Sequence, residues 1–441
     1  SMFFFKVGKQ RQNKMLYYNI DELETSLKSP NNIVAIHGAG LRGRLVLYAF
    51  AKRGINVDFF VDNDKQKQNK LYCNIKTIST EEFSKIEPNS HLFISHDYII
   101  PIMEELKKLN FKNYYNTVDL LEKTNFSNGN EYTKKYPNWT PLKMERYLKN
   151  HKYSADKAAR VFSKIGHDVF NIKHVDIVVT ERCSMKCKHC SNLMQYYVRP
   201  QNVDLNILFK SLDRMMQCVD QIYEFRVIGG DPFMNKEMYK VVNKLVKYQN
   251  VETVVIYTNA KIVPRGENLE CLKDKKIRLE ITNYGSSAAK TTWGYLTEKH
   301  DEIISLLDTH KIPYQTDLVK LWDDIGLIKY EKKTHKQLNK LFTDCCAKDL
   351  FTILHGTLYK CPVSAHGTNL KAIPFDEKYD GIDLTNENIS IKDLRKKLQD
   401  FHDNDKYISA CKYCKGRGYG FGTIKAAIQT KKPLPINQIP N

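Results

Sequence analysis

A chain of 441 residues with 42% hydrophobic residues is long enough for two or three packed domains, and no apolar run approaches the ~18 residues of a membrane span. The 69 lysines and arginines exceed the 50 aspartates and glutamates, which gives a net charge of +19 and fits an anionic partner such as a nucleotide or phosphorylated metabolite. The basic residues are scattered and form no stripe interleaved with aromatic residues, so the pattern does not favour a nucleic-acid-binding module.

The first segment, residues 31–120, alternates strand-like and helix-like patterns and predicts a Rossmann-like domain over residues 1–125. Strands are expected near 33–36, 57–61, 92–95 and 113–116, and helices over 41–53 and 99–109. Gly38, Gly40 and Gly43 would allow a tight turn and close approach of the backbone to a phosphate. Asp62, about 20 residues further on, can meet a sugar hydroxyl. The alternative is a domain that keeps this fold without binding a dinucleotide.

Two short segments indicate which kind of ligand the N-terminal domain would bind. Ile36-His-Gly-Ala-Gly40 and Phe60-Val-Asp-Asn63 resemble the nucleotide-sugar-binding domain of some sugar acyltransferases from bacterial surface-polysaccharide pathways. The resemblance implies a nucleotide-linked sugar as the ligand of this domain. Arg42 departs from that family, which has a small or aliphatic residue at this place. Residues 126–170, which are rich in Asn, Pro, Lys and Tyr, are expected to form a helical linker.

From Val175 to residue 335, strands and helices alternate again and predict a parallel βα barrel over residues 171–335. Strands are expected over 175–180, 225–228, 253–257 and 276–281, and a helix over 205–218. Three thiolates, Cys183, Cys187 and Cys190, follow the first strand within eight residues. They can ligate three corners of a four-iron, four-sulfur cluster and leave one iron open. The alternative is a zinc knuckle or a set of buried thiols.

The motif Cys183-Ser-Met-Lys-Cys187-Lys-His-Cys190 resembles the radical S-adenosylmethionine (radical SAM) superfamily. The resemblance implies a partial (β/α)6 barrel and a [4Fe–4S] cluster that binds S-adenosylmethionine. The stretch Gly229-Gly-Asp-Pro232 resembles the Gly-Gly-Glu motif of the family, which holds the amino group of S-adenosylmethionine. By that resemblance the cofactor-binding residues are Gly229, Gly230, Asp231 and Pro232, with His189 near the adenine and Asn259 and Asn283 at the ribose and carboxylate. Asp231 is one methylene shorter than the glutamate of the family.

A second cysteine group lies in residues 336–441. Period-two runs on either side of His355-Gly356 predict a β-hairpin. Four thiols around it could close a second cluster: Cys346, Cys361, Cys411 and Cys414, with Cys345 as the alternative to Cys346. Their spacing resembles the twitch domain, a short form of the SPASM auxiliary-cluster module, and implies one auxiliary [4Fe–4S] cluster. A four-thiolate zinc site is the competing interpretation.

The remaining three cysteines, Cys73, Cys218 and Cys271, have no partners in these motifs and are expected to be small buried hydrophobes. Clustered cysteines without an evident secretion signal favour metal binding in a reducing cytoplasm over disulfides, so we expect a cytoplasmic, oxygen-sensitive protein.

The radical SAM resemblance implies an oxidoreductase that cleaves S-adenosylmethionine reductively and abstracts a substrate hydrogen, with flavodoxin or ferredoxin as the electron donor. The N-terminal domain makes a nucleotide-linked or surface-polysaccharide sugar the expected substrate, which would be oxidised or epimerised. One alternative is a radical SAM maturase that modifies peptides. Another is a metal-cluster module that binds nucleic acid and has no catalytic activity. The sequence names no catalytic side chain.

Overall fold

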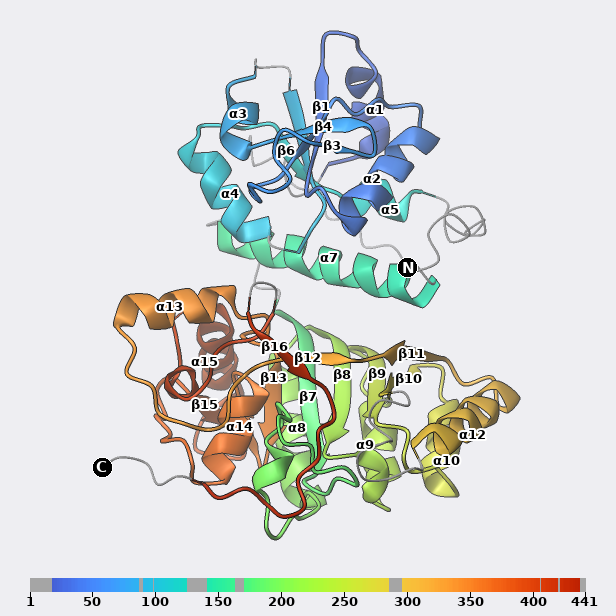
Figure 1. The fold of residues 1–441 in the computed structure, drawn as a ribbon, viewed down its shortest axis with the longest axis vertical. Helices are drawn as coiled ribbons and strands as arrows, with labels where there is room; N and C mark the ends of the chain where they lie inside the picture. The colour runs from blue at the N-terminus through green and yellow to red at the C-terminus, as the bar shows by residue number, and fades with distance from the viewer. Residues whose placement is uncertain are drawn as a thin grey trace. The chain divides into compact units, whose positions relative to one another are not determined.

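The computed structural model describes residues 18–86, 90–97, 99–124, 141–162, 170–284, 296–404, 406–418 and 421–436. The chain forms two compact units, residues 1–168 and 169–441 (Figure 1). No helix among the described residues is both long and apolar enough to cross a membrane.

Unit 1 contains a six-stranded sheet in the order β3-β4-β2-β1-β5-β6. Its strands are β1 (Ile33–His37), β2 (Phe59–Val61), β3 (Leu71–Tyr72), β4 (Ile75–Ile78), β5 (Ser90–Ile94) and β6 (Tyr114–Asn116). Its helices are α1 (Ile20–Leu27), α2 (Leu41–Lys52), α3 (Thr80–Ser84), α4 (Ile99–Lys108), α5 (Val118–Glu122) and α7 (Pro141–Phe162). All strand pairs are parallel except the β3–β4 hairpin, so the predicted α/β alternation of this unit is confirmed.

Helix α7 lies in the region predicted as a linker, yet its side chains are part of the core of unit 1. Met144 and Tyr147 are buried with the apolar residues of β1 and α2, and Ala155 and Ala158 are buried with those of α4. Two further parts of the predicted linker, 126–140 and 163–169, lie outside the described residues.

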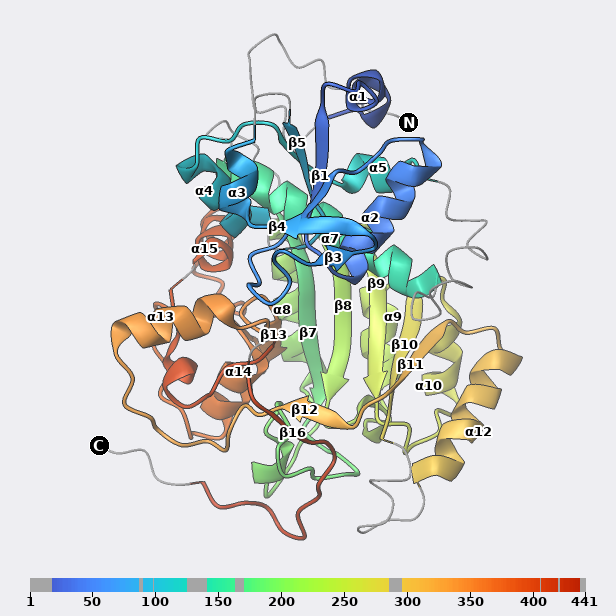
Figure 2. The same cartoon turned by 45° about the horizontal axis from the view of Figure 1, so that its top comes forward.

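Unit 2 is built on an eight-stranded sheet in the order β11-β10-β9-β8-β7-β13-β14-β15. Its strands are β7 (Asn171–Thr180), β8 (Gln221–Gly229), β9 (Val251–Thr258), β10 (Ile277–Asn283), β11 (Tyr314–Leu318), β13 (Phe351–Leu354), β14 (Thr357–Tyr359) and β15 (Gly381–Asp383). The six strands from β11 to β13 are parallel to their neighbours, and β14 and β15 are antiparallel. Figure 2 shows β7, β8 and β9 side by side.

One face of this sheet is covered by α8 (Leu205–Cys218), α9 (Met238–Leu245), α10 (Glu267–Glu270), α12 (Leu296–Thr309) and α15 (Ile391–Asp403). Helix α14 (Pro362–Asn369) packs Ala365 against Val178 and Ile228 on the other face, and α13 (His335–Asp344) packs in a separate cluster beside the second cysteine group. Leu208, Leu212 and Met215 of α8 share a core with Val175 and Ile177 of β7. The apolar period that predicted α8 therefore marks the side that packs on the sheet.

The opposite face of the sheet is different, because alternate residues of the same strands are polar. Asp176 on β7, Arg226 on β8 and Tyr257 on β9 line a cavity on that face. Central strands of parallel sheets are usually apolar on both sides. The charged residues therefore mark the face on which a polar ligand can be held.

The predicted hairpin is confirmed. His355 (φ 47°) and Gly356 (φ 87°) both lie in the left-handed region, as a tight two-residue hairpin turn requires. Its first strand, β13, pairs in parallel with β7, so the hairpin extends the main sheet. A separate ribbon joins β12 (Leu321–Asp323) to β16 (Thr423–Lys425). The mixed α/β class is confirmed; closure into a partial barrel and the division near residue 335 stay predictions.

Candidate functional site

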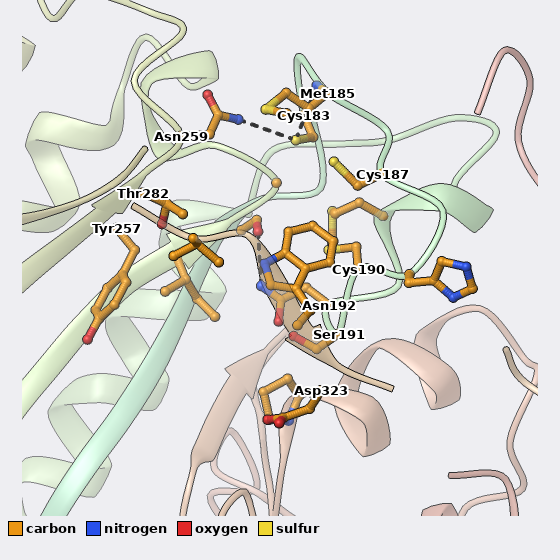
Figure 3. A pocket seen from close by; sticks show the side chains of 18 of the residues that line it. Cys183, Met185, Cys187, Cys190, Ser191, Asn192, Tyr257, Asn259, Thr282 and Asp323 are labelled. Atoms are coloured by element: carbon orange, nitrogen blue, oxygen red, sulfur yellow. Dashed lines mark hydrogen bonds between the residues drawn. The ribbon is translucent and has the colours of Figure 1, made fainter. Parts of the chain in front are cut away.

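A cavity of about 510 Å³ opens where β7 to β10 end. The three-cysteine loop follows β7, Gly229 and Gly230 end β8, Asn259 follows β9, and Thr282 lies near the end of β10. Figure 3 shows Cys183, Cys187 and Cys190 on one side of this cavity and Tyr257 and Thr282 on the other. Ligand sites of parallel α/β folds lie at this edge of the sheet.

The three thiols are held by the backbone of their own loop and by the C-terminal segment. Cys183 Sγ accepts a hydrogen bond from the Met185 amide at 3.5 Å. The amide of Lys188 donates to the Ile428 carbonyl at 2.6 Å, and that of Thr430 donates to the Lys186 carbonyl at 2.9 Å. The loop is therefore paired on both sides of Cys187, which fixes the direction of its thiols.

The chemistry of the three thiols fits a metal cluster. Burial is the main cause that raises the pKa of Cys183 to about 12, and the nearby Cys190 acts in the same direction. Burial also raises the pKa values of Cys187 and Cys190. A buried thiolate needs a compensating positive charge, which a bound metal supplies while it displaces the thiol protons. No three His, Cys, Asp or Glu side chains in the described ranges are arranged as ligands of a single metal ion.

Glycine is required at both positions where β8 meets the cysteine loop. A Cβ on Gly229, whose φ is 157°, would lie 2.1 Å from the backbone oxygen of Thr180. A Cβ on Gly230 would lie 2.2 Å from the backbone oxygen of Arg182 and 2.6 Å from the Cβ of Cys183. The two glycines therefore let the end of β8 pack directly under the loop, and both line the cavity.

Asp231 and Pro232 do not line this cavity. The buried carboxylate of Asp231 accepts hydrogen bonds from Thr258 Oγ1 at 2.8 Å and from the amides of Asn259 (3.0 Å) and Phe233 (3.1 Å). It thereby ties the end of β8 to the end of β9, and burial raises its pKa. Its predicted contact with the amino group of a cofactor stays a prediction.

Of the other residues predicted to bind the cofactor, some line the cavity and one does not. Asn259 lines the cavity, and its Nδ2 lies 3.8 Å from Cys183 Sγ and 3.4 Å from Ser184 Oγ. His189 also lines it. Asn283 does not, whereas its neighbours Thr282 and Tyr284 do, because consecutive side chains of a strand point to opposite faces.

Several residues that line the cavity were not predicted. They are Asp176, Arg226, Tyr257, Tyr284, Trp322, Asp323 and Arg417. Tyr284 and Trp322 meet edge to face with ring centroids 5.6 Å apart, and both pack against the three-cysteine loop. The signal that could have found Asp176 and Arg226 is a charged residue next to buried apolar residues within a strand.

The second cysteine group surrounds a small apolar cavity of about 40 Å³. Cys345, Cys361, Cys411 and Cys414 line it, and burial raises the pKa of each of these thiols. The exposed Cys346 is not part of the lining; it lies beside Gly418. The structure therefore brings Cys345, the alternative, together with the other three, because consecutive residues after α13 point in different directions.

In unit 1 the glycine turn and Asp62 contact each other. A Cβ on Gly43 would lie 1.9 Å from the Gly38 carbonyl oxygen, so this glycine lets α2 pack against the turn. Asp62 accepts hydrogen bonds from the amides of Ala39 and Asp64, both at 2.9 Å, and pairs with Lys67 at 2.9 Å. Gly40 has open space around it. These contacts explain the motif as local structure, and ligand binding at Gly38, Gly40, Gly43 and Asp62 stays a prediction.

Of the remaining cysteines, Cys218 and Cys271 are buried as expected, whereas Cys73 is exposed because it lies in the turn between β3 and β4.

Comparison with known proteins finds similarity to enzymes named GTP 3′,8-cyclase. A GTP 3′,8-cyclase of Clostridium acetobutylicum is 25% identical over 153 residues, which cover 34% of this chain and 48% of that protein. A GTP 3′,8-cyclase of Staphylococcus epidermidis is 29% identical over 105 residues, 22% of this chain and 30% of that protein. The chain thus spans half or less of the length of these two relatives. No model of a known protein family matches the chain.

Solved structures with a similar arrangement are remote. One is anSMEcpe with bound AdoMet, at 11% identity and a TM-score of 0.38 over 60% of this chain and 93% of that one. Another is BtrN in complex with AdoMet and 2-DOIA, at 15% identity and a TM-score of 0.32 over 60% of this chain and 97% of that one. The sequence similarity to GTP 3′,8-cyclases and the three-cysteine loop at the end of β7 agree with the resemblance of this chain to the radical SAM superfamily.

Proposed function

We propose that unit 2 cleaves S-adenosylmethionine reductively at a [4Fe–4S] cluster held by Cys183, Cys187 and Cys190. The observation that carries this proposal is the single cavity shared by the three thiols and the ends of four parallel strands. Its volume of about 510 Å³ lies in the range of small-molecule sites, about 300–1,000 Å³. The bound cluster and cofactor would supply a 5′-deoxyadenosyl radical that abstracts hydrogen.

The residues of the chain position the reactants and exclude water. The backbone of Gly229 and Gly230 lines the cavity and holds the end of β8 directly against the cysteine loop. Asn259 can orient a polar group of the cofactor beside Cys183. Tyr284 and Trp322 supply an apolar wall against the cysteine loop, which would keep water away from a reactive intermediate.

A second cluster on Cys345, Cys361, Cys411 and Cys414 would make the net reaction an oxidation. Ser191, Pro362 and Arg417 line both cavities, so the two sites share a wall. A substrate held in the larger cavity could then pass one electron across this wall. We therefore favour dehydrogenation over epimerisation, with flavodoxin or ferredoxin as the reductant of the first cluster.

For the substrate we propose a nucleotide-linked sugar. The support is the resemblance of unit 1 to a nucleotide-sugar-binding domain and the confirmed α/β alternation of that unit. The second candidate is a purine nucleotide, because the relatives that match this chain are named GTP 3′,8-cyclases.

The test is anaerobic reconstitution followed by counting of iron and sulfide and an assay for 5′-deoxyadenosine. We expect about eight irons per chain. The Cys183→Ala variant should form no 5′-deoxyadenosine, whereas Cys218→Ala, which removes a buried thiol outside both groups, should retain it. Wild-type protein that binds its cluster and S-adenosylmethionine but forms no 5′-deoxyadenosine with any reductant contradicts the proposal. About four irons with one zinc would refute the auxiliary cluster.

Products separate the two substrates. Incubation with a nucleoside diphosphate hexose should yield a product two hydrogens lighter. Conversion of GTP to an isomer of the same mass would favour the purine nucleotide instead.

A further inference from the structure

The larger cavity is lined by a carboxylate, Asp176, that has a buried oxygen without a hydrogen-bond partner among the described residues. Asp176, on β7, is only 4% exposed and lines the cavity. In the part of the chain that the structure describes, no group bonds to its buried Oδ1 atom. Buried polar atoms are paired in the great majority of cases, and an unpaired one costs about 1–3 kcal/mol. The position therefore calls for a partner that comes from outside the chain.

Arg226 lies directly beside this carboxylate. Asp176 and Arg226 are partners in the register of β7 and β8, so their side chains share one face of the sheet. Arg226 Nε donates to Glu224 at 2.6 Å, and its guanidinium lies 5.5 Å from the centre of the Tyr257 ring. Both Arg226 and Tyr257 line the cavity. Glu224 and Tyr257 thus hold the guanidinium in place, and within the described ranges its terminal N–H groups make no hydrogen bond.

We propose that Asp176 and Arg226 form a substrate-binding site for a hydroxyl-bearing ligand, a sugar ring. This inference rests on the proposed function, whose substrate it specifies further. A hydroxyl group is both donor and acceptor. It can donate to Asp176 and accept from Arg226 at the same time, and a ring with adjacent hydroxyls can do so through two oxygens.

Other chemical groups of a ligand would pair less favourably with the charged side chains beside Asp176. An apolar group would leave the Asp176 oxygen buried and unpaired. A protonated amine would pair with Asp176 but face two positive charges, because Arg226 and Arg417 both act electrostatically on this carboxylate. A carboxylate or phosphate would suit the arginines but be repelled by Asp176 and Glu224. A neutral hydroxyl is the group that meets each of these side chains favourably.

The protonation of Asp176 agrees with this geometry. Burial raises the pKa of Asp176 to about 7, opposed by Arg226 and Arg417 and assisted by Glu224. A ligand hydroxyl that donates to the carboxylate stabilises its ionised form and would lower this pKa again.

The experiment is calorimetric titration of the reconstituted holoenzyme with UDP-, GDP- and dTDP-hexoses, followed by the deoxy analogues of the hexose that binds best. In wild-type protein, removal of the hydroxyl that meets Asp176 should weaken binding about tenfold to a hundredfold. The Asp176→Asn variant should bind the parent hexose about tenfold to a hundredfold more weakly than wild type does. This variant should bind the same deoxy analogue about as tightly as it binds the parent hexose. Arg226→Gln should behave in the same way.

The control is Asp220→Asn. Asp220 caps the Phe170 amide and pairs with Arg395 at 2.7 Å, at the opposite end of β8, so its loss should leave hexose affinity unchanged. Failure of every hexose to bind wild-type protein, or equal discrimination against the deoxy analogues in wild type and Asp176→Asn, would overturn the inference. Formation of 5′-deoxyadenosine by the same wild-type preparation tests the proposed function separately. Iron content and thermal unfolding show whether each variant has folded.

Discussion

Replacing Gly230 with alanine should displace the three-cysteine loop. The added Cβ would lie 2.2 Å from the Arg182 carbonyl oxygen and 2.6 Å from the Cys183 Cβ, whereas ordinary contacts are 3.4–4 Å. Neither atom belongs to a flexible side-chain end, so rotation cannot relieve the overlap. The loop must move by about 1 Å, and a displacement of that size at a reacting centre costs on the order of a hundredfold in rate.

We expect Gly230→Ala to form 5′-deoxyadenosine about a hundredfold more slowly than wild type and to be less stable by about 1–3 kcal/mol. The measurements are single-turnover formation of 5′-deoxyadenosine, iron content after reconstitution, and denaturant unfolding. The matched control is Gly422→Ala, because a Cβ there would meet nothing closer than Asp324 Cβ at 3.9 Å. A Gly230→Ala protein with full iron content and wild-type turnover would refute the packing argument.

Three further predictions concern other parts of the chain. Cys345→Ala should lose about four irons per chain, whereas Cys346→Ala should keep all of them; the opposite result would place Cys346 in the cluster. Burial raises the pKa of Asp176 from 3.8 to about 7 in the folded protein. As the pH rises between these two values, the carboxyl ionises more readily in the unfolded chain, and the free energy of unfolding falls by up to about 4 kcal/mol. The melting temperature of Asp176→Asn should therefore exceed that of wild type at pH 8, and the excess should be much smaller at pH 4. An excess in melting temperature that does not change with pH would contradict this prediction. Asp62→Ala should destabilise unit 1 by about 1–3 kcal/mol in denaturant unfolding, with or without a nucleotide sugar, because two partly buried amides lose their acceptor.

Local signals predicted the elements well. Leu208, Leu212 and Met215 recur at helical spacing, and Asp204 accepts hydrogen bonds from the amides of Asn206 and Ile207, so α8 begins where the pattern predicts. The hairpin turn followed from Gly356, which can adopt a positive φ.

Pairings between distant segments were not predictable in this way. The contact of β7 with β13 joins strands about 175 residues apart and leaves no periodic signal in either of them. Helix α7 was assigned to a linker because its neighbours contain Pro, Asn and Gly, although its own apolar residues belong to the core of unit 1.

The side chains at the site were predicted to different degrees. The three-cysteine motif identified its loop, because the spacing of the thiols is itself the signal. The choice between Cys345 and Cys346 depends on the direction in which the chain leaves α13, which composition does not reveal. Asp176 and Arg226 required the strand register, because only neighbouring strands bring the two charges together.

The place of β13 in the sheet has a consequence for how the protein is made. Until residues 351–354 leave the ribosome, β7 is the last strand of its sheet and exposes a free edge at Val175, Asp176 and Ile177. At about 5–20 residues per second, synthesis takes on the order of ten seconds or more to cover the distance from β7 to β13. Free edges of apolar strands invite pairing with other chains. The nascent chain is therefore most prone to aggregation during that interval, and slower synthesis would lengthen it.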